Sequence, residues 1–556
     1  MASKSTPITL REQLLVLLAT LLAVLAAIFW SATHHAFLLY GDAEAHTHIA
    51  RRLFDSHRPG LGQLGSVWLP LPHLLLAPFV AIDPLWRSGF AGAIPSAICY
   101  LLASLGLYRL ARRWLGPLAA TMALVFFAAN PNLLYMATTA MSEPLFLAEL
   151  IWAVLLLVEW HAHLGEPSEN SRQWAVIAVL IAAVLTRYDG WILACLAWAA
   201  MATALFRRAR LTRPGFVLAS VALLASPLAW MLYNQLYFGD WLDFMRGPYS
   251  AKAIELRTAN GAIPPHPGWH NPWVSALFFA KAAELDSVAR GWGWALWIAS
   301  LVGIDWAWRR RMDNHPSPAI GHVRTSPLWT LLLWLPLPFY AYSVSFGSVP
   351  IFLPVWWPHS FYNTRYGMEL LPALALFLGF FEQAGSMRHH HPRLDLAVTL
   401  LLFAAVGANI AAMLAQGPLV YLEGTKNAAA RDQYNAQLSA ALATLHTAQP
   451  GAIALMDTSN FPSIVPRAGM TYRQTLNESD KQFYAAALAA PADHAQIVLA
   501  FAGDTVAQAV ASHPQGLRLY RQFHSSRQPD ASLYLAHGFP DTVYQFKDSQ
   551  PQEGRW

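Results

Sequence analysis

Cysteine and charged residues are scarce in this chain, and each scarcity excludes a class of protein. Among 556 residues there are two cysteines, Cys99 and Cys195, and both lie inside apolar runs. A disulfide framework and a thiolate metal site are therefore excluded, and both side chains are expected to serve in packing. Charged residues make up 12% of the chain, against about 25% in soluble domains. The composition thus excludes an ordinary soluble protein.

Apolar residues are abundant instead: 55% of the chain is hydrophobic and the mean hydropathy is +0.33. This composition predicts a polytopic membrane protein. The 23 tryptophans suit it, because indole rings settle at the level of the lipid headgroups. A net charge of +5 could suggest nucleic acid, but the basic residues stand in short clusters between apolar runs. Such clusters orient membrane proteins, so no nucleic-acid partner is predicted.

The apolar runs predict a mainly α-helical membrane bundle of about eleven transmembrane helices. The expected spans are 13–32, 88–108, 118–137, 143–160, 174–187, 191–206, 215–236, 292–308, 327–346, 367–384 and 396–415. No small-residue cleavage site follows the first run, so we expect an uncleaved anchor rather than a signal peptide.

The basic clusters between these runs fall on one side in this count, among them Arg109, Arg112 and Arg113, and Arg207 to Arg213. Because cytoplasmic loops carry an excess of Lys and Arg, we expect a cytoplasmic N-terminus in a cell inner membrane. The opposite, external side then receives three long segments: 33–87, 237–291 and the residues from about 416 onward. The chemistry is expected on that side.

Two external segments have recognisable features. The run "LGSVWLPLPHLLLAPFVAIDP" is interrupted by Pro70, Pro72 and Pro78, which predicts helices lying in the interface as a jaw. In the C-terminal region, "GAIALMD" and "AQIVLAFAG" predict short buried strands, and "DKQFYAAALAAPADH" predicts helix. We therefore expect two domains: a transmembrane domain over 1–415 and a small external α/β domain over 416–556.

An acidic motif follows the first run directly, in "LLYGDAEAHTHIARRLFDS", which places Asp42, Glu44, His46 and His48 in seven positions. Carboxylates at membrane depth are rare and tend to line a water-filled cavity or substrate path, which makes Asp42 and Glu44 candidate catalytic residues. Simple solvation of a helix end is the alternative. Imidazole and carboxylate are both metal donors, so a weak metal site at Asp42, His46 and His48 also stays open.

Two more polar spots are expected on the external side. Glu143 begins the fourth span in "TTAMSEPLFLAEL", where Ser142 could simply cap the helix and Glu143 favour its dipole. "LTRYDGW" places Arg187 and Asp189 in a very short turn, where they could form an internal pair. Arginine is normally kept off short external loops, so Arg187 is also a candidate for binding an anionic partner.

A further candidate surface lies in "WWPHSFYNTRYGMELLP", residues 356–372. Trp356 and Trp357 suit an interfacial aromatic belt. A second isolated arginine, Arg365, stands here among aromatic and amide side chains, and this group is typical of a binding surface. Its candidate residues are Tyr362, Asn363, Arg365 and Tyr366.

In their order and side, these motifs resemble those of integral-membrane C-type glycosyltransferases: the acidic motif after the first helix, "WLPLPHLL", the Ser-Glu-Pro start of the fourth helix, and Arg-Tyr-Gly before a late apolar helix. The chain is most similar to the bacterial relatives of protein O-mannosyltransferases and of the lipid A aminoarabinose transferase. The likeness covers roughly residues 10–415.

The resemblance implies an inverting transferase that moves a hexose or pentose from a polyprenyl-phosphate donor to an acceptor hydroxyl or amine at the external face of the cell envelope. It implies that Asp42 is the catalytic base, although Ala43 separates it from Glu44 where many relatives have adjacent acids. Glu143 would orient hydroxyl groups, and Arg365 with Arg187 would neutralise the leaving phosphate. The acceptor would be a glycan, lipid or protein.

No cofactor is predicted, and a divalent metal at Asp42, His46 and Glu143 stays an alternative. Two other functions stay open: a membrane transporter, and a catalytically inactive scaffold or sensor with an external domain. A transporter usually shows inverted repeats and polar breaks near the midplane, whereas these charged groups cluster at helix ends.

Overall fold

The computed structural model describes residues 8–259, 261, 263–312, 327–386 and 392–539. The chain forms two compact units, each assembled from separate parts of the sequence. Unit 1 comprises Met1–Phe37, Ser66–Leu75 and Gly92–Gly424. Unit 2 comprises Leu38–Gly65, Leu76–Ala91 and Thr425–Trp556. Unit 2 thus joins most of the C-terminal region to the segment after the first long helix, and the domain boundary at residue 415 stays a prediction.

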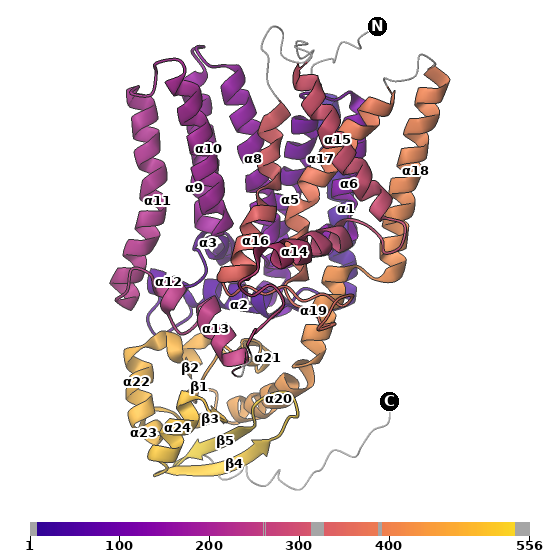
Figure 1. Cartoon of the computed structure of the whole chain (residues 1–556). Helices are drawn as coiled ribbons and strands as arrows, with labels where there is room; N and C mark the ends of the chain where they lie inside the picture. Colours follow the sequence, from indigo (N-terminus) through magenta and orange to yellow (C-terminus); the bar gives the residue numbers. More distant parts are fainter. Residues whose placement is uncertain (1–7, 260, 262, 313–326, 387–391, 540–556) are drawn as a thin grey trace. The chain divides into compact units, whose positions relative to one another are not determined.

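Unit 1 is helical. Its helices are α1 (Leu10–Thr33), α5 (Phe90–Ala111), α6 (Pro117–Ala128), α7 (Pro131–Met136), α8 (Glu143–Ala162), α9 (Glu169–Thr186), α10 (Asp189–Phe206), α11 (Pro214–Phe238), α12 (Asp243–Arg246), α13 (Ala251–Thr258), α14 (Pro272–Ser287), α15 (Trp294–Met312), η2 (Pro327–Trp334), α16 (Pro336–Phe346), η3 (Thr364–Leu370), α17 (Leu371–Ser386), α18 (Pro392–Gln416) and α19 (Leu419–Ala429). Figure 1 shows α8, α9, α10 and α11 side by side, and these helices contact one another.

Eight helical segments of the described chain are long and apolar enough to cross a membrane. They are Leu10–Thr33, Phe90–Ala111, Glu143–Ala162, Asp189–Phe206, Pro214–Phe238, Pro327–Phe346, Thr364–Gly385 and Arg393–Ala429. The expected count of about eleven is not confirmed. The expected spans at 118–137, 174–187 and 292–308 are helical, but they are not among these eight.

The helix α1 illustrates why such a segment suits a bilayer. Thr9 accepts a hydrogen bond from the Glu12 amide, and the Glu12 carboxylate accepts one from the Thr9 amide, so a capping box begins the helix. Beyond it, Leu14, Leu18 and Leu22 are each more than half exposed. A contiguous apolar face of this kind is unfavourable in water and favourable against lipid.

The core of unit 1 lies around α17, which packs against α15 and α6. Gly379 of α17 meets the Ala119 backbone so closely that an added Cβ would lie 2.8 Å from its carbonyl oxygen. This close approach of two helices is typical of small residues in membrane bundles. Phe377 and Phe380 are fully buried beside it.

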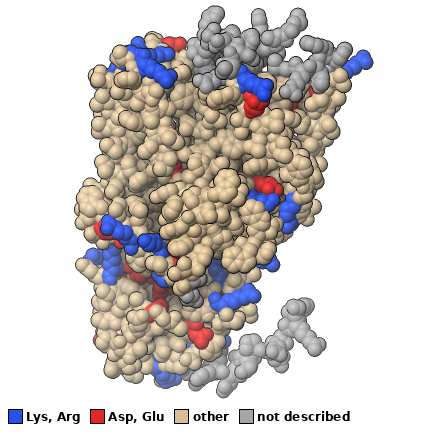
Figure 2. Space-filling view, in the orientation of Figure 1, with Lys and Arg blue, Asp and Glu red and all other residues tan. Residues whose placement is uncertain are grey.

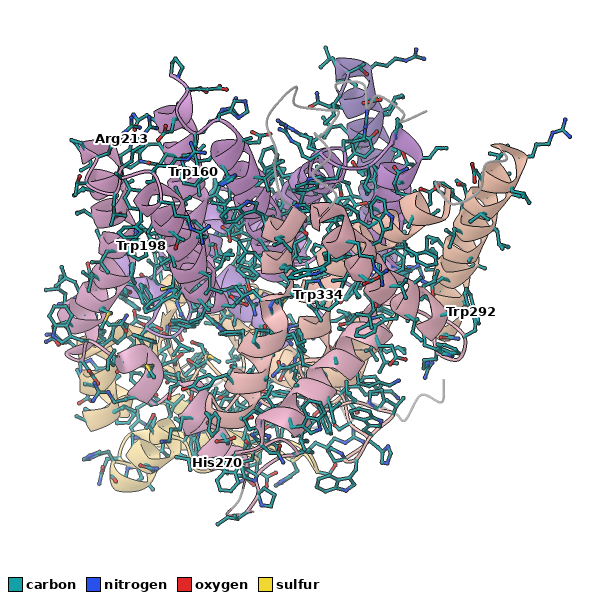
Figure 3. The ribbon with its side chains drawn as sticks, turned by 45° about the horizontal axis from the view of Figure 1, so that its top comes forward. Trp160, Trp198, Arg213, His270, Trp292 and Trp334 are labelled. Carbon is teal, nitrogen blue, oxygen red and sulfur yellow. The ribbon has the colours of Figure 1, made fainter. Side chains whose placement is uncertain are left out.

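Charged and aromatic side chains are distributed unevenly over unit 1. In Figure 2, Lys and Arg gather where α10 passes into α11 (upper left), and the helices below show mostly other residues. Arg210 and Arg213 of this connection both pair with Glu169. Figure 3 shows Trp198 and Trp292 towards opposite edges of the view, and both are about two-fifths exposed. Partly exposed tryptophans are typical of interfacial anchors.

Unit 2 is mixed α and β, as expected for the C-terminal region. Its elements are α2 (Gly41–Arg52), η1 (Leu61–Leu64), α4 (Asp83–Ser88), α20 (Asp432–Ala448), β1 (Ala454–Met456), α21 (Ile464–Arg467), η4 (Tyr472–Gln474), β2 (Thr475–Leu476), η5 (Glu478–Asp480), α22 (Gln482–Ala489), α23 (Pro491–His494), β3 (Ile497–Phe501), α24 (Thr505–Ser512), β4 (Leu517–Phe523) and β5 (Ala531–Ala536). The expected strands are β1 and β3, and the expected helical stretch forms α22 and α23.

The sheet has the order β2-β1-β3-β5-β4. Strands β2, β1 and β3 are parallel, with Leu455 opposite Val498, whereas β5 is antiparallel to both β3 and β4. Figure 1 shows β4 and β5 as neighbouring arrows. The all-buried pattern of β3, "IVLAF", is the apolar run that predicted it.

The helix α3 (Leu71–Val80) belongs partly to each unit and contains Pro78. Ten residues give a helix of about 15 Å, which is too short to span a bilayer. Its interfacial, jaw-like position stays a prediction. The helix α2, in contrast, differs from the sequence prediction, which places only a polar segment at a helix end there.

Candidate active site

The acidic motif forms the amino end of α2, with Asp42 and Glu44 in its first turn. Carboxylates are favoured there by the unpaired amide groups of the helix end. Because consecutive helical residues are rotated by about 100°, side chains two positions apart point in different directions. Glu44 is buried, at 1% exposure, whereas Asp42 is only partly buried. The two acids therefore do not form a pair.

Glu44 is held by Arg431, which precedes α20 in unit 2. The Arg431 guanidinium lies 3.4 Å from the Glu44 carboxylate and also donates to the Leu39 carbonyl. Burial raises the pKa of Glu44 to about 7, although Arg431 and Arg467 act in the opposite direction. Glu44 is thus a structural acid in the first turn of α2, and Asp42 is the carboxylate that stays partly exposed.

The two histidines of the motif do not converge with these acids on a metal. His48 is buried against Trp86 and Tyr472, and its Nδ1 accepts a hydrogen bond from Trp86 Nε1. His46 is buried as well. Among the described residues, no three His, Cys, Asp or Glu side chains are placed to hold a metal ion. The structure gives no support to the weak metal site.

In unit 1, Arg187 lies at the centre of a buried polar network. Its guanidinium is 3.2 Å from Asp189 and 2.9 Å from Glu369, and it donates to the Tyr340 hydroxyl at 2.6 Å. Tyr340 in turn donates to Glu369 at 2.8 Å. The internal Arg187–Asp189 pair that the sequence left open is therefore present.

The same network includes Arg365 and Glu143. Arg365 Nε lies 3.0 Å from a Glu143 oxygen, and Arg187 lies 3.5 Å from that same oxygen. A second carboxylate, Glu423, is 3.7 Å from Arg365 and accepts a hydrogen bond from Thr364. Two guanidinium groups thus meet four buried carboxylates, since Asp189 and Glu369 belong to the same network.

These contacts bear on two expectations. Ser142 does not cap α8 with its side chain; its hydroxyl accepts a hydrogen bond from Arg187 instead. The positions of Arg187 and Arg365 also need no external anion, because carboxylates of the protein satisfy both charges, as buried charges require. Binding of an anionic ligand by Arg187 and Arg365 stays a prediction.

The aromatic segment before α17 divides into two parts. Tyr366 stacks on Tyr340 at 4.9 Å between ring centres, and the Arg365 and Arg187 cations lie 4.9 and 5.3 Å from the Tyr366 ring. Tyr362 instead pairs its backbone with Phe352, and Asn363 donates to the Pro350 carbonyl. Tyr366 therefore belongs to the network, and Tyr362 and Asn363 stabilise the preceding loop.

Sequence reasoning missed several members of these groups: Tyr340, Glu369, Glu423 and Arg431. Glu369 lies within the segment 356–372 that the sequence singled out, but its partner Arg187 is far from it in the chain. For Arg431 no local signal existed, because its partner is 387 residues away.

Comparisons with known proteins agree with this fold. A family model described as dolichyl-phosphate-mannose-protein mannosyltransferase matches residues 70–233. The crystal structure of ArnT from Cupriavidus metallidurans bound to undecaprenyl phosphate is similar at a TM-score of 0.54 and 14% identity, over 93% of this chain and 97% of that one. No curated protein matches the sequence significantly.

A crystal structure of the Archaeoglobus fulgidus oligosaccharyltransferase in complex with Zn and sulfate gives a TM-score of 0.49 at 13% identity, over 87% of this chain and 68% of that one. The chain is a multi-pass membrane protein with the fold of the ArnT structure. The family-model match and the ArnT fold agree with the resemblance noted from the sequence.

Proposed function

We propose that this protein is an inverting C-type glycosyltransferase that uses a polyprenyl-phosphate sugar as donor. The observation that carries the proposal is the ArnT fold over almost the whole chain, with a partly exposed acid, Asp42, directly after the first long helix. The family-model match over residues 70–233 adds independent support. The ArnT structure was determined with undecaprenyl phosphate, the class of lipid phosphate that the proposed donor would release.

In the proposed reaction, Asp42 accepts the proton of an acceptor hydroxyl or amine. The acceptor atom forms a bond to the anomeric carbon as the bond from that carbon to the phosphate oxygen breaks, with inversion. Polyprenyl phosphate leaves with the bonding electron pair. A positioned base typically contributes a hundredfold to ten-thousandfold to such a rate. Asp42 is favoured over Glu44 because Glu44 is buried and bound to Arg431.

The network in unit 1 is proposed to take part in substrate binding. Glu143, Asp189 and Tyr366 supply polar or aromatic groups that suit a sugar ring, and Arg187 and Arg365 supply positive charge. Because four carboxylates share these two cations, phosphate binding here would require some of the acids to be protonated. Tyr362 and Asn363 are proposed only as residues of the adjoining loop.

The remaining assignments complete the proposal. The sugar is a hexose or pentose, and the acceptor is a glycan, lipid or protein at the external face of a cell inner membrane. The N-terminus is proposed to be cytoplasmic and the C-terminal region external. A transporter or an inactive scaffold is not favoured, because the fold and the family model both lead to transferases.

Purified protein in detergent, supplied with radiolabelled polyprenyl-phosphate hexoses and pentoses, tests this proposal. The wild type is compared with Asp42→Asn and with Glu44→Gln, which removes charge from the buried neighbour on the same helix. Turnover that is lost in Asp42→Asn and retained in part in Glu44→Gln supports Asp42 as the base. No transfer or hydrolysis with any donor, in folded protein, would contradict the transferase function.

A further inference from the structure

The two consecutive arginines at the end of α2, Arg51 and Arg52, are both buried but differ in their partners. Arg51 is fully engaged: it pairs with Asp55 at 3.0 Å and Asp83 at 2.6 Å, donates to the Val80 carbonyl, and lies over the Trp86 ring. Arg52 forms no ion pair or hydrogen bond with any of the described residues. Its one close contact is the Tyr472 ring, 5.8 Å from the guanidinium carbon.

An arginine in this state is costly to keep. The side chain is 8% exposed, and its Nε is completely buried without a hydrogen-bond partner in the described structure. A buried guanidinium without a partner loses hydration that nothing replaces, so natural proteins usually pair it. Arg52 is therefore placed for a role other than the stability of α2.

A second unused donor lies one helical turn before Arg52, on His48. Burial, with Arg52 nearby, lowers the pKa of His48 to about 3, so the imidazole is neutral. Its Nδ1 accepts the Trp86 hydrogen bond, which places the remaining proton on Nε2. That Nε2 is buried and donates to none of the described residues.

Two hydroxyl groups extend the same set. Tyr472 of η4 contacts both side chains, with its ring 5.7 Å from the His48 ring, and its buried hydroxyl has no partner in the described chain. Ser56 follows Arg52 by four residues, and its buried Oγ is likewise unpaired within the described residues. Four donors from α2, its following turn and the C-terminal region are thus without acceptors.

Most acids of this region are already engaged with other groups. Asp55 accepts from Arg51 and from the Tyr472 and Arg473 amides, and Glu44 pairs with Arg431. Asp480 accepts from the Asn477 amide through one carboxylate oxygen; the other oxygen is buried without a hydrogen-bond partner, and its charge acts on Arg52, but the two residues form no ion pair among the described contacts. Glu478 accepts from Thr458 and Ser459. Unused donors therefore outnumber unused acceptors around Arg52.

We propose that Arg52, His48 Nε2 and the Tyr472 hydroxyl form a binding site for a phosphate group in unit 2, with Ser56 as a further donor. A tetrahedral oxyanion supplies several acceptor oxygens and the negative charge that the Arg52 guanidinium lacks. Two sources share this chemistry: free phosphate, and the headgroup of a polyprenyl phosphate. Only the lipid source rests on the proposed transferase function.

Binding to the full-length protein in detergent tests the site without any turnover. The probes are inorganic phosphate, undecaprenyl phosphate and, as a lipid without the anion, undecaprenol. Arg52→Gln is expected to weaken phosphate binding at least tenfold, since a hydrogen bond to a charged group is lost. Tyr472→Phe, which keeps the ring, is expected to weaken it severalfold. Arg521→Gln removes the same charge from exposed β4 and is expected to have no effect.

The outcomes distinguish between the two phosphate sources, and between failure of the phosphate site and failure of the proposed function. Binding of both phosphate probes, or of either one alone, through Arg52 supports the site and identifies its source. Absence of binding by both overturns it, as does equal weakening by Arg52→Gln and Arg521→Gln. A structural role for Arg52 would make Arg52→Gln lower the unfolding temperature as much as Arg51→Gln does, and this too would overturn the proposal. A protein that binds phosphate but transfers no sugar would contradict the proposed function and still support the phosphate site.

Discussion

Removal of the Arg431 side chain should destabilise the protein in a strongly pH-dependent way. Glu44 has a pKa of about 7 in the folded protein and about 4.5 in its ordinary environment. Between these values the unfolded chain releases a proton that the folded chain retains, so stability falls as pH rises, and the fall ends above pH 7. In Arg431→Gln the buried Glu44 loses its nearest cation, and its pKa rises further.

The size of the destabilisation follows because Glu44 in the folded variant retains its proton above pH 7. Above pH 7, each pH unit costs the variant about 1.4 kcal/mol that the wild type does not lose. The additional destabilisation is therefore close to zero at pH 6, about 1 kcal/mol at pH 7.5 and about 3 kcal/mol at pH 9. Loss of the hydrogen bond from Arg431 to the Leu39 carbonyl adds a smaller, pH-independent amount.

Unfolding of the purified protein in detergent, followed from pH 6 to 9, measures this effect. Arg431→Gln is compared in the wild-type background and in a Glu44→Gln background, where the pH dependence should vanish. Arg467→Gln is the matched control, because this arginine also acts on Glu44 but is exposed and paired with Asp432. An equal loss of stability at pH 6 and pH 9, or a pH dependence that persists with Glu44→Gln, would refute the reasoning.

Three further predictions concern single sites, and a fourth concerns a truncation. Asp42→Asn should lower glycosyl transfer by about a hundredfold or more and leave donor binding intact, measured by turnover and lipid binding in parallel. His48→Asn should resist acid unfolding better than the wild type. The folded pKa of His48, about 3, lies below its ordinary value of 6.5, so the wild type loses up to about 4 to 5 kcal/mol of stability as the pH falls through that interval. Acid unfolding curves of both proteins test this. Arg187→Met should destabilise unit 1 by about 3 to 5 kcal/mol, and Glu369→Gln should restore part of it, as seen by thermal unfolding. Truncation after Gly424 should abolish donor hydrolysis as well as transfer, because unit 2 includes both α2 and the residues removed; hydrolysis that survives truncation would contradict this.

A separate external domain over 416–556 leads to a different expectation for this truncation. A separate C-terminal domain would serve acceptor recognition and could be removed with donor chemistry intact. In the structure, Arg431, Tyr472 and Arg473 contact α2 or the turn that follows it. The C-terminal region therefore belongs to the framework of the proposed catalytic helix.

Much of the fold could be predicted from local features. Runs such as 13–32 and 215–236 identify α1 and α11, because length and hydropathy suffice to describe a membrane helix. The short apolar runs around Leu455 and Val498 identify β1 and β3, because a continuous apolar run of this length is typical of a buried strand. The count of spans was less certain, because segments such as α9 are shorter or less apolar than a free-standing span requires.

For the candidate site, too, sequence and tertiary structure determine different things. The sequence by itself determined which residues are unusual: acids after a helix, and arginines where the orientation rule excludes them. Only the tertiary structure decided what each one does, because partners lie far apart in the chain: Arg365 and Glu143 are separated by 222 residues, and Arg431 and Glu44 by 387. A buried charge is stabilised by whichever group the fold brings within hydrogen-bond distance, and no local pattern encodes that distance. For this reason the adjacent arginines Arg51 and Arg52 have different environments: Arg51 forms two ion pairs, whereas Arg52 forms no ion pair or hydrogen bond with the described residues.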